Sequence, residues 1–227
     1  MKYRSLSHFS GIGLGLVVLA TAMAVLSGCG GSLLPGITAE PPQLYTLTPK
    51  STFTRKFAKV DWQLTIDKPI AQAALATARI ALRQSPISLE YYARANWVDT
   101  APLMIQTLLV ESFENSNSIV SVGRQSVMLR ADYNLLTELR EFQAEYNGAG
   151  APKIRVRINS KLVKMPQRII IGTLTVERVQ QAKNGEMEAV VLAFDAALGK
   201  TLKRIVEWCL VTAPTSHPTS KRKPMQR

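Results

Sequence analysis

The chain has 227 residues, a formal net charge of +12, two cysteines and two histidines. Both histidines, His8 and His217, lie near the ends, so the central part lacks the commonest general base and a common metal ligand. This composition argues against hydrolytic or metal-dependent catalysis, while the positive charge favours an anionic partner such as lipid, acidic protein or nucleic acid.

Residues 1–28 have the organisation of a secretory signal peptide. Lys2 and Arg4 form a short positive region, and Gly11–Leu26 is an uncharged run rich in Leu, Val and Ala. The run has 16 residues, whereas a helix that spans a bilayer needs roughly 20. We therefore expect this segment to direct export and to be removed, and export also disfavours nucleic acid as a partner.

The apolar run ends in a motif that resembles the bacterial lipobox. In Leu26-Ser27-Gly28-Cys29, small residues precede a cysteine that would be lipidated and become the new N-terminus. An N-acyl diglyceride on Cys29 would anchor the chain, because each buried methylene contributes about 0.8 kcal/mol and stable anchoring takes more than one acyl chain. No other cofactor is expected. Gly30 stands where an aspartate usually retains enterobacterial lipoproteins at the inner membrane, so we expect the periplasmic face of the outer membrane.

The chain after the predicted cleavage site divides into a tether, one domain and a tail. Residues 29–43 are rich in Gly and Pro and predict a flexible tether. Residues 44–211 contain the periodic patterns and are long enough for a single domain with a core. Residues 212–227 are rich in Pro, Ser, Thr and Lys and predict a disordered basic tail. Cys209 lies in an apolar run without an expected disulfide partner, which indicates a packed thiol.

Short strands dominate the first part of the predicted domain. Tyr45–Leu47 reads as a short strand that ends before Pro49, and Trp62–Ile66 alternates apolar and polar residues as a half-buried strand does. Arg79–Arg83 and Leu89–Ala93 are separated by a Ser-Pro turn. The sequence therefore predicts that this last pair forms a β-hairpin.

A helix, a brief strand and a long hairpin are predicted next. Thr100 can cap a helix, Pro102 suits its first turn, and apolar residues recur at helical spacing before Asn115–Ser118 ends it. Ile119–Val122 is a brief strand. Further on, two alternating segments, Ile154–Ile158 and Ile169–Val179, predict long strands joined at Met165-Pro166.

Two more segments have helical spacing. Met187–Val211 contains no Pro and places apolar residues on one side, which predicts a long amphipathic helix. In Asp132–Tyr146, Leu135, Leu139 and Phe142 also follow helical spacing. Periodicity alone therefore predicts a helix there as well.

Several segments, in this order, carry a resemblance to a known family: Tyr45-Thr46-Leu47, Arg79-Ile80-Ala81-Leu82, Leu89-Glu90-Tyr91-Tyr92, Ala95-Asn96-Trp97-Val98-Asp99, Asp132-Tyr133-Asn134-Leu135 and Ile205-Val206-Glu207-Trp208. Together they resemble the ABC-type transport auxiliary lipoprotein family, the lipoproteins found with MCE-type lipid transport systems. The resemblance implies a single α/β domain in which a mixed β-sheet is packed by helices, including a long C-terminal helix. It also implies that residues 132–146 form a strand, which we place at a sheet edge, instead of a helix.

The resemblance also implies a function in the cell envelope. The partner would be an MCE-domain protein that bridges the periplasm and works with an inner-membrane permease and ATPase. The role of this chain would be to dock or support that bridge at the outer membrane during phospholipid transport. An envelope structural or assembly lipoprotein without a transport role is the alternative. A homo-oligomer such as a ring would suit a symmetric MCE assembly.

Neither a catalytic residue nor a metal site is expected, and the chain is not predicted to be an enzyme. The sequence contains no Gly-x-Ser-x-Gly elbow and no Gly-x-x-x-x-Gly-Lys-Ser/Thr phosphate loop. Carboxylate pairs such as Glu138 and Glu141 are explained by a solvated face. Tyr91, Tyr92 and Trp97 are the candidate partner or lipid contacts, although packing in the core or at its rim is the favoured explanation of these aromatic residues.

Overall fold

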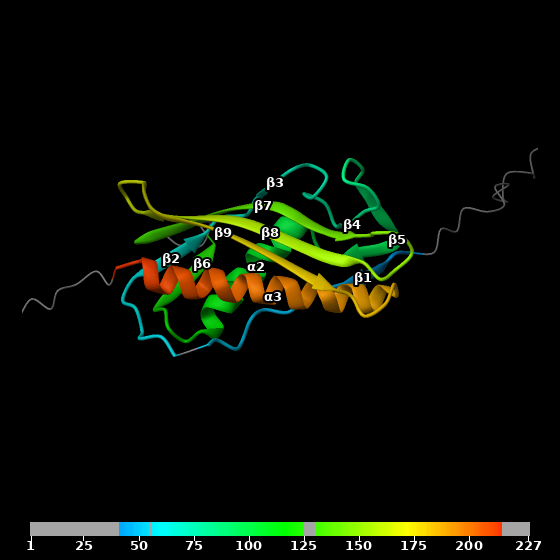
Figure 1. The fold of residues 1–227 in the computed structure, drawn as a ribbon. Coiled ribbons are helices and arrows are strands. Elements are labelled where there is room, and N and C mark those ends of the chain that lie inside the picture. The colour runs from blue at the N-terminus through cyan, green and yellow to red at the C-terminus, as the bar shows by residue number, and fades with distance from the viewer. Residues whose placement is uncertain (1–40, 55, 125–129, 215–227) are drawn as a thin grey trace, which may run out of the picture. The chain divides into compact units, whose positions relative to one another are not determined.

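The computed structural model describes residues 41–54, 56–124 and 130–214. The chain divides into two units, Met1–Glu40 and Pro41–Arg227, and the described residues all belong to the second. The predicted lipobox (Leu26, Ser27, Gly28 and Cys29) and most of the predicted tail lie outside the described residues. The elements of the second unit are shown in Figure 1: β1 (Gln43–Tyr45), β2 (Gln63–Ile66), β3 (Ile70–Ala71), β4 (Arg79–Arg83), β5 (Glu90–Trp97), α2 (Ala101–Asn115), β6 (Ser121–Arg124), β7 (Tyr133–Glu145), β8 (Lys153–Lys164), β9 (Ile169–Gln181) and α3 (Met187–Thr212).

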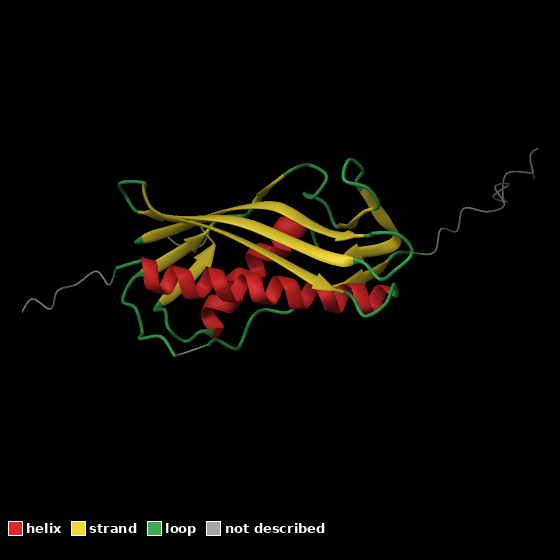
Figure 2. Cartoon of the chain, viewed as in Figure 1, coloured by secondary structure: helices red, strands yellow, loops and turns green. Residues whose placement is uncertain are grey.

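All the described strands belong to one mixed sheet built around β7. One edge of β7 pairs antiparallel with β8, which pairs antiparallel with β9, and these three long strands run side by side in Figure 2. The other edge of β7 pairs in parallel with β2, β3 and β4 in succession along its length. Beyond these, β6 extends the sheet from β2, and β5 and β1 extend it from β4.

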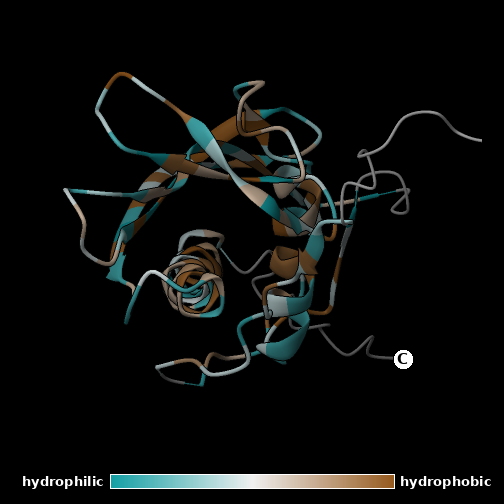
Figure 3. Ribbon diagram, turned by 90° about the vertical axis from the view of Figure 1, so that its right-hand side faces the viewer, coloured by the Kyte–Doolittle hydropathy of each residue, from teal (hydrophilic) through white to brown (hydrophobic). Residues whose placement is uncertain are grey.

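Both helices of the described residues pack against this sheet. α3 lies along β8 and β9, and α2 contacts α3, β2 and β6. Figure 3 looks nearly along α3 and shows the long strands curving over it. On β8, Ile154, Val156 and Ile158 are fully buried, whereas Arg155 and Arg157 alternate with them and are partly exposed. The predicted α/β class, the mixed sheet and the long C-terminal helix are therefore confirmed.

Tyr133–Glu145 forms the strand β7, which confirms the strand implied by the family resemblance, and the helix predicted from periodicity alone is wrong. A β-bulge between Leu139 and Glu141 explains the misleading spacing. Leu135 and Leu139 lie on one face because their separation is even, and the extra residue in the bulge returns Phe142 to that same face. The expected position is also wrong. β7 pairs on both edges and lies inside the sheet.

Two local predictions need correction in detail. β2 was expected to be half-buried, but Leu64, Thr65 and Ile66 are all buried. This is because β2 lies between β6 and β7 in the sheet and also contacts α2. Thr100 does occupy the position before α2, yet its side chain makes no capping hydrogen bond. Instead, its backbone N–H donates to Asp99 Oδ1 at 2.6 Å. The predicted hairpin is confirmed as β4 and β5.

Candidate functional site

Trp97, one of the three candidate contact residues, lies in the core. Its side chain is 1% exposed at the end of β5. The Trp97 ring centroid is 5.2 Å from that of Phe194 on α3 and 5.6 Å from that of Phe142 on β7. The ring therefore joins the sheet to the long helix.

Tyr91 and Tyr92 are half-buried on β5, and each has a defined contact. The Tyr91 hydroxyl donates to the Ala74 carbonyl at 3.1 Å, and the Arg79 guanidinium lies 3.8 Å from the centre of the Tyr91 ring. The Tyr92 and Tyr146 hydroxyls are 2.9 Å apart. Burial, followed by the hydrogen bond with Tyr146, raises the pKa of Tyr92 above its ordinary value. A contact of these tyrosines with a partner stays a prediction.

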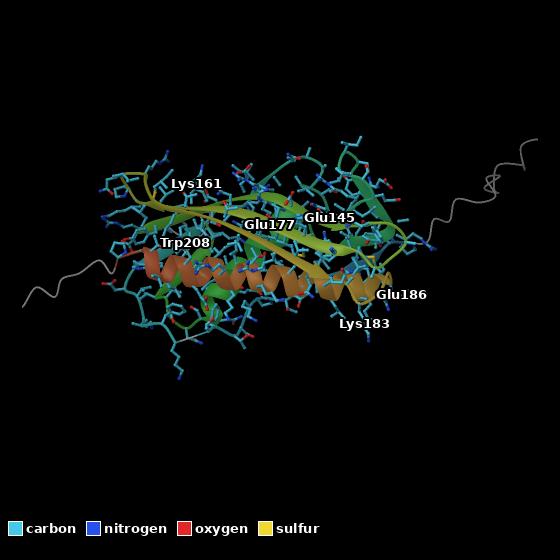
Figure 4. The ribbon with its side chains drawn as sticks, viewed as in Figure 1. Glu145, Lys161, Glu177, Lys183, Glu186 and Trp208 are labelled. Carbon is cyan, nitrogen blue, oxygen red and sulfur yellow. The ribbon has the colours of Figure 1, made fainter. Side chains whose placement is uncertain are left out.

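The face of the sheet opposite α3 carries a row of ion pairs. Arg155 on β8 donates from Nε to Glu145 on β7 at 2.9 Å, and it also pairs with Glu177 on β9. Both carboxylates are labelled in Figure 4. Burial alone would raise the pKa of Glu145, but hydrogen bonds from Arg155 and Gln143 outweigh it and hold that pKa below its usual value. The row links three neighbouring strands.

A basic cavity opens along one side of α3. Lys203 and Arg204 lie three and four residues after Lys200, and Glu207 lies four and three residues after these two, so all four lie on the same side of the helix. Together with side chains from β9 and from the segment before β2, they line an open cavity of about 320 Å³ that we call the Lys200 groove: Thr54, Arg178, Lys200, Lys203, Arg204 and Glu207.

A more apolar cavity adjoins the Lys200 groove. This cavity, the Trp208 pocket, has a volume of about 370 Å³ and is lined by Thr54, Phe57, Arg204, Glu207, Trp208 and Val211. Arg204, Glu207 and Thr54 line both cavities, so the two lie side by side. The Glu207 carboxylate accepts a hydrogen bond from the Thr54 backbone N–H at 3.0 Å, which holds the loop against α3. Trp208 is labelled near the end of the helix in Figure 4.

A third cavity, of about 430 Å³, lies where the β8–β9 turn meets β7. Val163 and Ile170 line it, and Ile170 is 53% exposed. Asp67 also lines this cavity, and its Oδ2 accepts a long hydrogen bond of 3.4 Å from Asn134. Asp67 and Arg168 are the charged residues of its lining, so this cavity carries fewer charged groups than the Lys200 groove.

Within residues 41–54, 56–124 and 130–214, no cluster of three or more His, Cys, Asp or Glu side chains is arranged to hold a metal ion. No helix in that part of the chain combines the length and apolar character of a membrane span. Cys209 is a free, fully buried thiol, as predicted, and burial raises its pKa.

Comparison with known proteins agrees with this architecture. The model of the ABC-type transport auxiliary lipoprotein component family matches residues 45–206. This range contains β2 to β9, α2 and most of α3, but only the last residue of β1. The chain belongs to this family. The family is one of membrane-anchored lipoproteins, and its name associates it with ABC-type transport.

Individual relatives extend the comparison. An uncharacterized protein of Bradyrhizobium diazoefficiens is 29% identical over 149 residues, which are 65% of this chain and 39% of that protein. The chain therefore spans about two fifths of the length of this curated relative. A solved protein from Xanthomonas campestris is 29% identical, with a TM-score of 0.71 over 75% of this chain and 95% of the other. A second solved structure, at 13% identity and a TM-score of 0.60, shares the fold.

Neither of the two cavities beside α3 was predicted from the sequence. The helical spacing of Lys200, Lys203 and Arg204 was a visible signal, but it is also the spacing of any solvated helix face. Arg178 and Thr54 come from separate parts of the chain, and only the fold brings them to α3. The segments that carry the family resemblance include Glu207 but none of the cationic residues that line the Lys200 groove.

Proposed function

We propose that this protein is the outer-membrane lipoprotein of an MCE-type intermembrane phospholipid transport system, where it docks or supports the MCE protein that bridges the periplasm. The family match over residues 45–206 is the observation that carries the proposal. The signal peptide and lipobox in the sequence support the same role, because an exported chain with an acylated Cys29 would stay at a membrane surface.

The fold supports docking as the mechanism. The core, from Leu47 to Ala213, joins sheet and helices in one cluster, so the domain presents its surfaces as a rigid body. Between Cys29 and Pro41, a fully extended chain would reach at most about 40 Å. An acylated Cys29 would therefore hold the domain close to the membrane at which the bridging protein must arrive.

Capture of partners from the native envelope tests the proposal. The tagged full-length protein is crosslinked in cells and purified, and the expected partners are an MCE-domain protein with its permease and ATPase. Recovery of peptidoglycan or an outer-membrane assembly complex in their place would support the structural alternative and contradict the transport role. A homo-oligomer would appear in the same experiment as crosslinked copies of this chain.

Anchorage is tested separately with two cysteine variants. Cys29→Ala is expected to leave the outer-membrane fraction and to lose complementation of a deletion strain. Cys209→Ala is the matched control, because it removes the other cysteine of the chain and leaves the proposed acylation site intact. If Cys29→Ala still fractionated with the outer membrane and complemented fully, the anchoring role would be wrong.

A further inference from the structure

We infer that the Lys200 groove binds the phosphate of an anionic phospholipid headgroup at a membrane surface, with the Trp208 pocket against the less polar part of the lipid. The inference rests on the proposed anchorage at a membrane. It goes further by assigning a second, non-covalent lipid contact to the folded domain and by naming the residues that make it.

The charge of the groove is the first argument. Arg178, Lys200, Lys203 and Arg204 line it, and among the described residues none of them forms an ion pair. Lys200 Nζ donates to the neutral amide oxygen of Gln180 at 2.9 Å, and Arg178 donates to a backbone carbonyl. By contrast, Arg140, Arg155 and Arg157 on the opposite face of the sheet all lie beside carboxylates. The groove therefore concentrates positive charge that the protein does not neutralise.

The one carboxylate in the groove is already engaged. Glu207 accepts the backbone N–H of Thr54 at 3.0 Å, so it serves the local structure of the loop. Four cationic side chains then face a single acidic group across an open cavity of about 320 Å³. This arrangement fits a phosphate, whose oxygens accept charge-assisted hydrogen bonds from guanidinium and ammonium groups at once.

The neighbouring pocket selects between kinds of phosphate. Arg204 lines both cavities, so a phosphate held by Arg204 lies directly beside the apolar walls of Phe57, Trp208 and Val211. Val211 is 60% exposed, and Trp208 is half-buried. At a membrane interface, headgroup phosphates lie next to the less polar glycerol and acyl segments. The cations of the groove match the phosphates, and the side chains of Trp208 and Val211 match the less polar segments. Inorganic phosphate would leave the apolar walls unused.

Vesicle binding by the unacylated domain provides the test. Residues 41–214 contain the whole described core, from Leu47 to Ala213, and exclude both the predicted anchor and most of the basic tail. The domain is mixed with vesicles of phosphatidylethanolamine and phosphatidylglycerol at 3:1, or of phosphatidylcholine alone, and binding is measured by co-sedimentation. Tryptophan emission is a second readout. Trp62 and Trp97 are buried, so a shift on binding reports Trp208 and should vanish in Trp208→Phe.

Two pairs of substitutions separate the groove from net charge. Lys200→Gln with Arg204→Gln should weaken binding to the anionic vesicles about thirty-fold, because each Lys or Arg near an anionic surface contributes about 1 kcal/mol. Lys153→Gln with Lys161→Gln removes the same charge from exposed positions of β8. This change should weaken binding less than about three-fold, because salt screens charges that lie far from the bound membrane. All four substituted side chains are at least partly exposed, so both variants should fold.

Three results would overturn the inference. Equal losses in the two double variants would mean that only net charge matters. Saturable binding of inorganic phosphate without vesicle binding would make the groove a site for free anions. Binding of poly-glutamate without vesicle binding would make it a surface for an acidic protein. Each of these outcomes leaves the proposed transport function intact, because partner capture and Cys29→Ala fractionation use the full chain in its native envelope.

Discussion

Replacement of Trp97 by alanine should lower the free energy of unfolding of the domain substantially. The Trp97 ring packs edge-to-face on Phe194 at 5.2 Å and tilted on Phe142 at 5.6 Å, and the Phe142 and Phe194 centroids are themselves 5.0 Å apart. Because the site is closed on all sides, the vacated space becomes a cavity. Large-to-small changes of this kind cost about 3–5 kcal/mol, a large fraction of the roughly 5–15 kcal/mol that stabilises a domain.

The loss can be measured by thermal and urea unfolding followed by far-ultraviolet circular dichroism. For a domain of this size, about 2–4 °C of melting temperature is lost per kcal/mol, so Trp97→Ala should melt about 6–20 °C lower. Val98→Ala is the matched control, since the next side chain is 53% exposed and its truncation should cost at most about 0.5 kcal/mol.

A double-mutant cycle tests the packing itself. Trp97→Ala and Phe194→Leu should be less costly together than the sum of the two single changes, by about 0.5–1.5 kcal/mol, because the ring pair can be lost only once. If Trp97→Ala stayed within about 1 kcal/mol of the parent protein while losing partner capture, the residue would be a contact and the reasoning from burial would be refuted.

Three further predictions follow from single contacts. Gln106 Nε2 donates to the buried Ile66 carbonyl at 2.8 Å, so Gln106→Leu should cost about 1–3 kcal/mol in urea unfolding by leaving that carbonyl unpaired. The pKa of Glu145 is lowered in the folded state. The ionised Glu145 carboxylate therefore stabilises the fold fully at a pH above its unfolded-state pKa of 4.5, and this contribution is lost as the pH falls through the lower folded-state pKa. The stability advantage over Glu145→Gln should accordingly shrink below pH 4.5 and stay constant above neutrality. Cys209 should resist alkylation at pH 8 in the native protein and react in urea, because burial raises its pKa and blocks access; rapid native labelling would contradict this placement.

Local patterns predicted the elements whose partners are near in sequence or whose period is uninterrupted. Helix α3 keeps one apolar side over its full length, and β4 and β5 are adjacent strands joined by a short turn. The pattern misled for β7, where spacings of four and three residues suit a helix. The same spacings suit a strand with one bulge, as between Leu139 and Glu141. A bulge depends on pairing with β8, so no window confined to residues 132–146 contains it.

The burial of Trp97 also depends on segments that are distant in the sequence, so the residues around it do not determine it. An aromatic residue at the end of a strand fits a surface contact and a core equally well, and the choice depends on what lies opposite. Phe142 and Phe194 settle it, and both come from elements formed much later in the chain. By contrast, Cys209 was assigned correctly as a packed thiol because its own helix supplies the apolar neighbours in sequence.

The groove beside α3 depends on a residue that no pattern marked. A Cβ placed on Gly172 of β9 would lie 2.9 Å from Thr212 Cγ2 and 3.0 Å from Trp208 Cζ2, so a side chain there would force these neighbours to shift. The absent side chain lets β9 approach the end of α3, and this approach supports the Trp208 ring as a wall of the apolar pocket. Further along the same strand, Arg178 reaches the basic groove. The close contact at Gly172 thus supports the apolar half of the lipid site that we infer, and the row of cations on α3 together with Arg178 supplies its basic half.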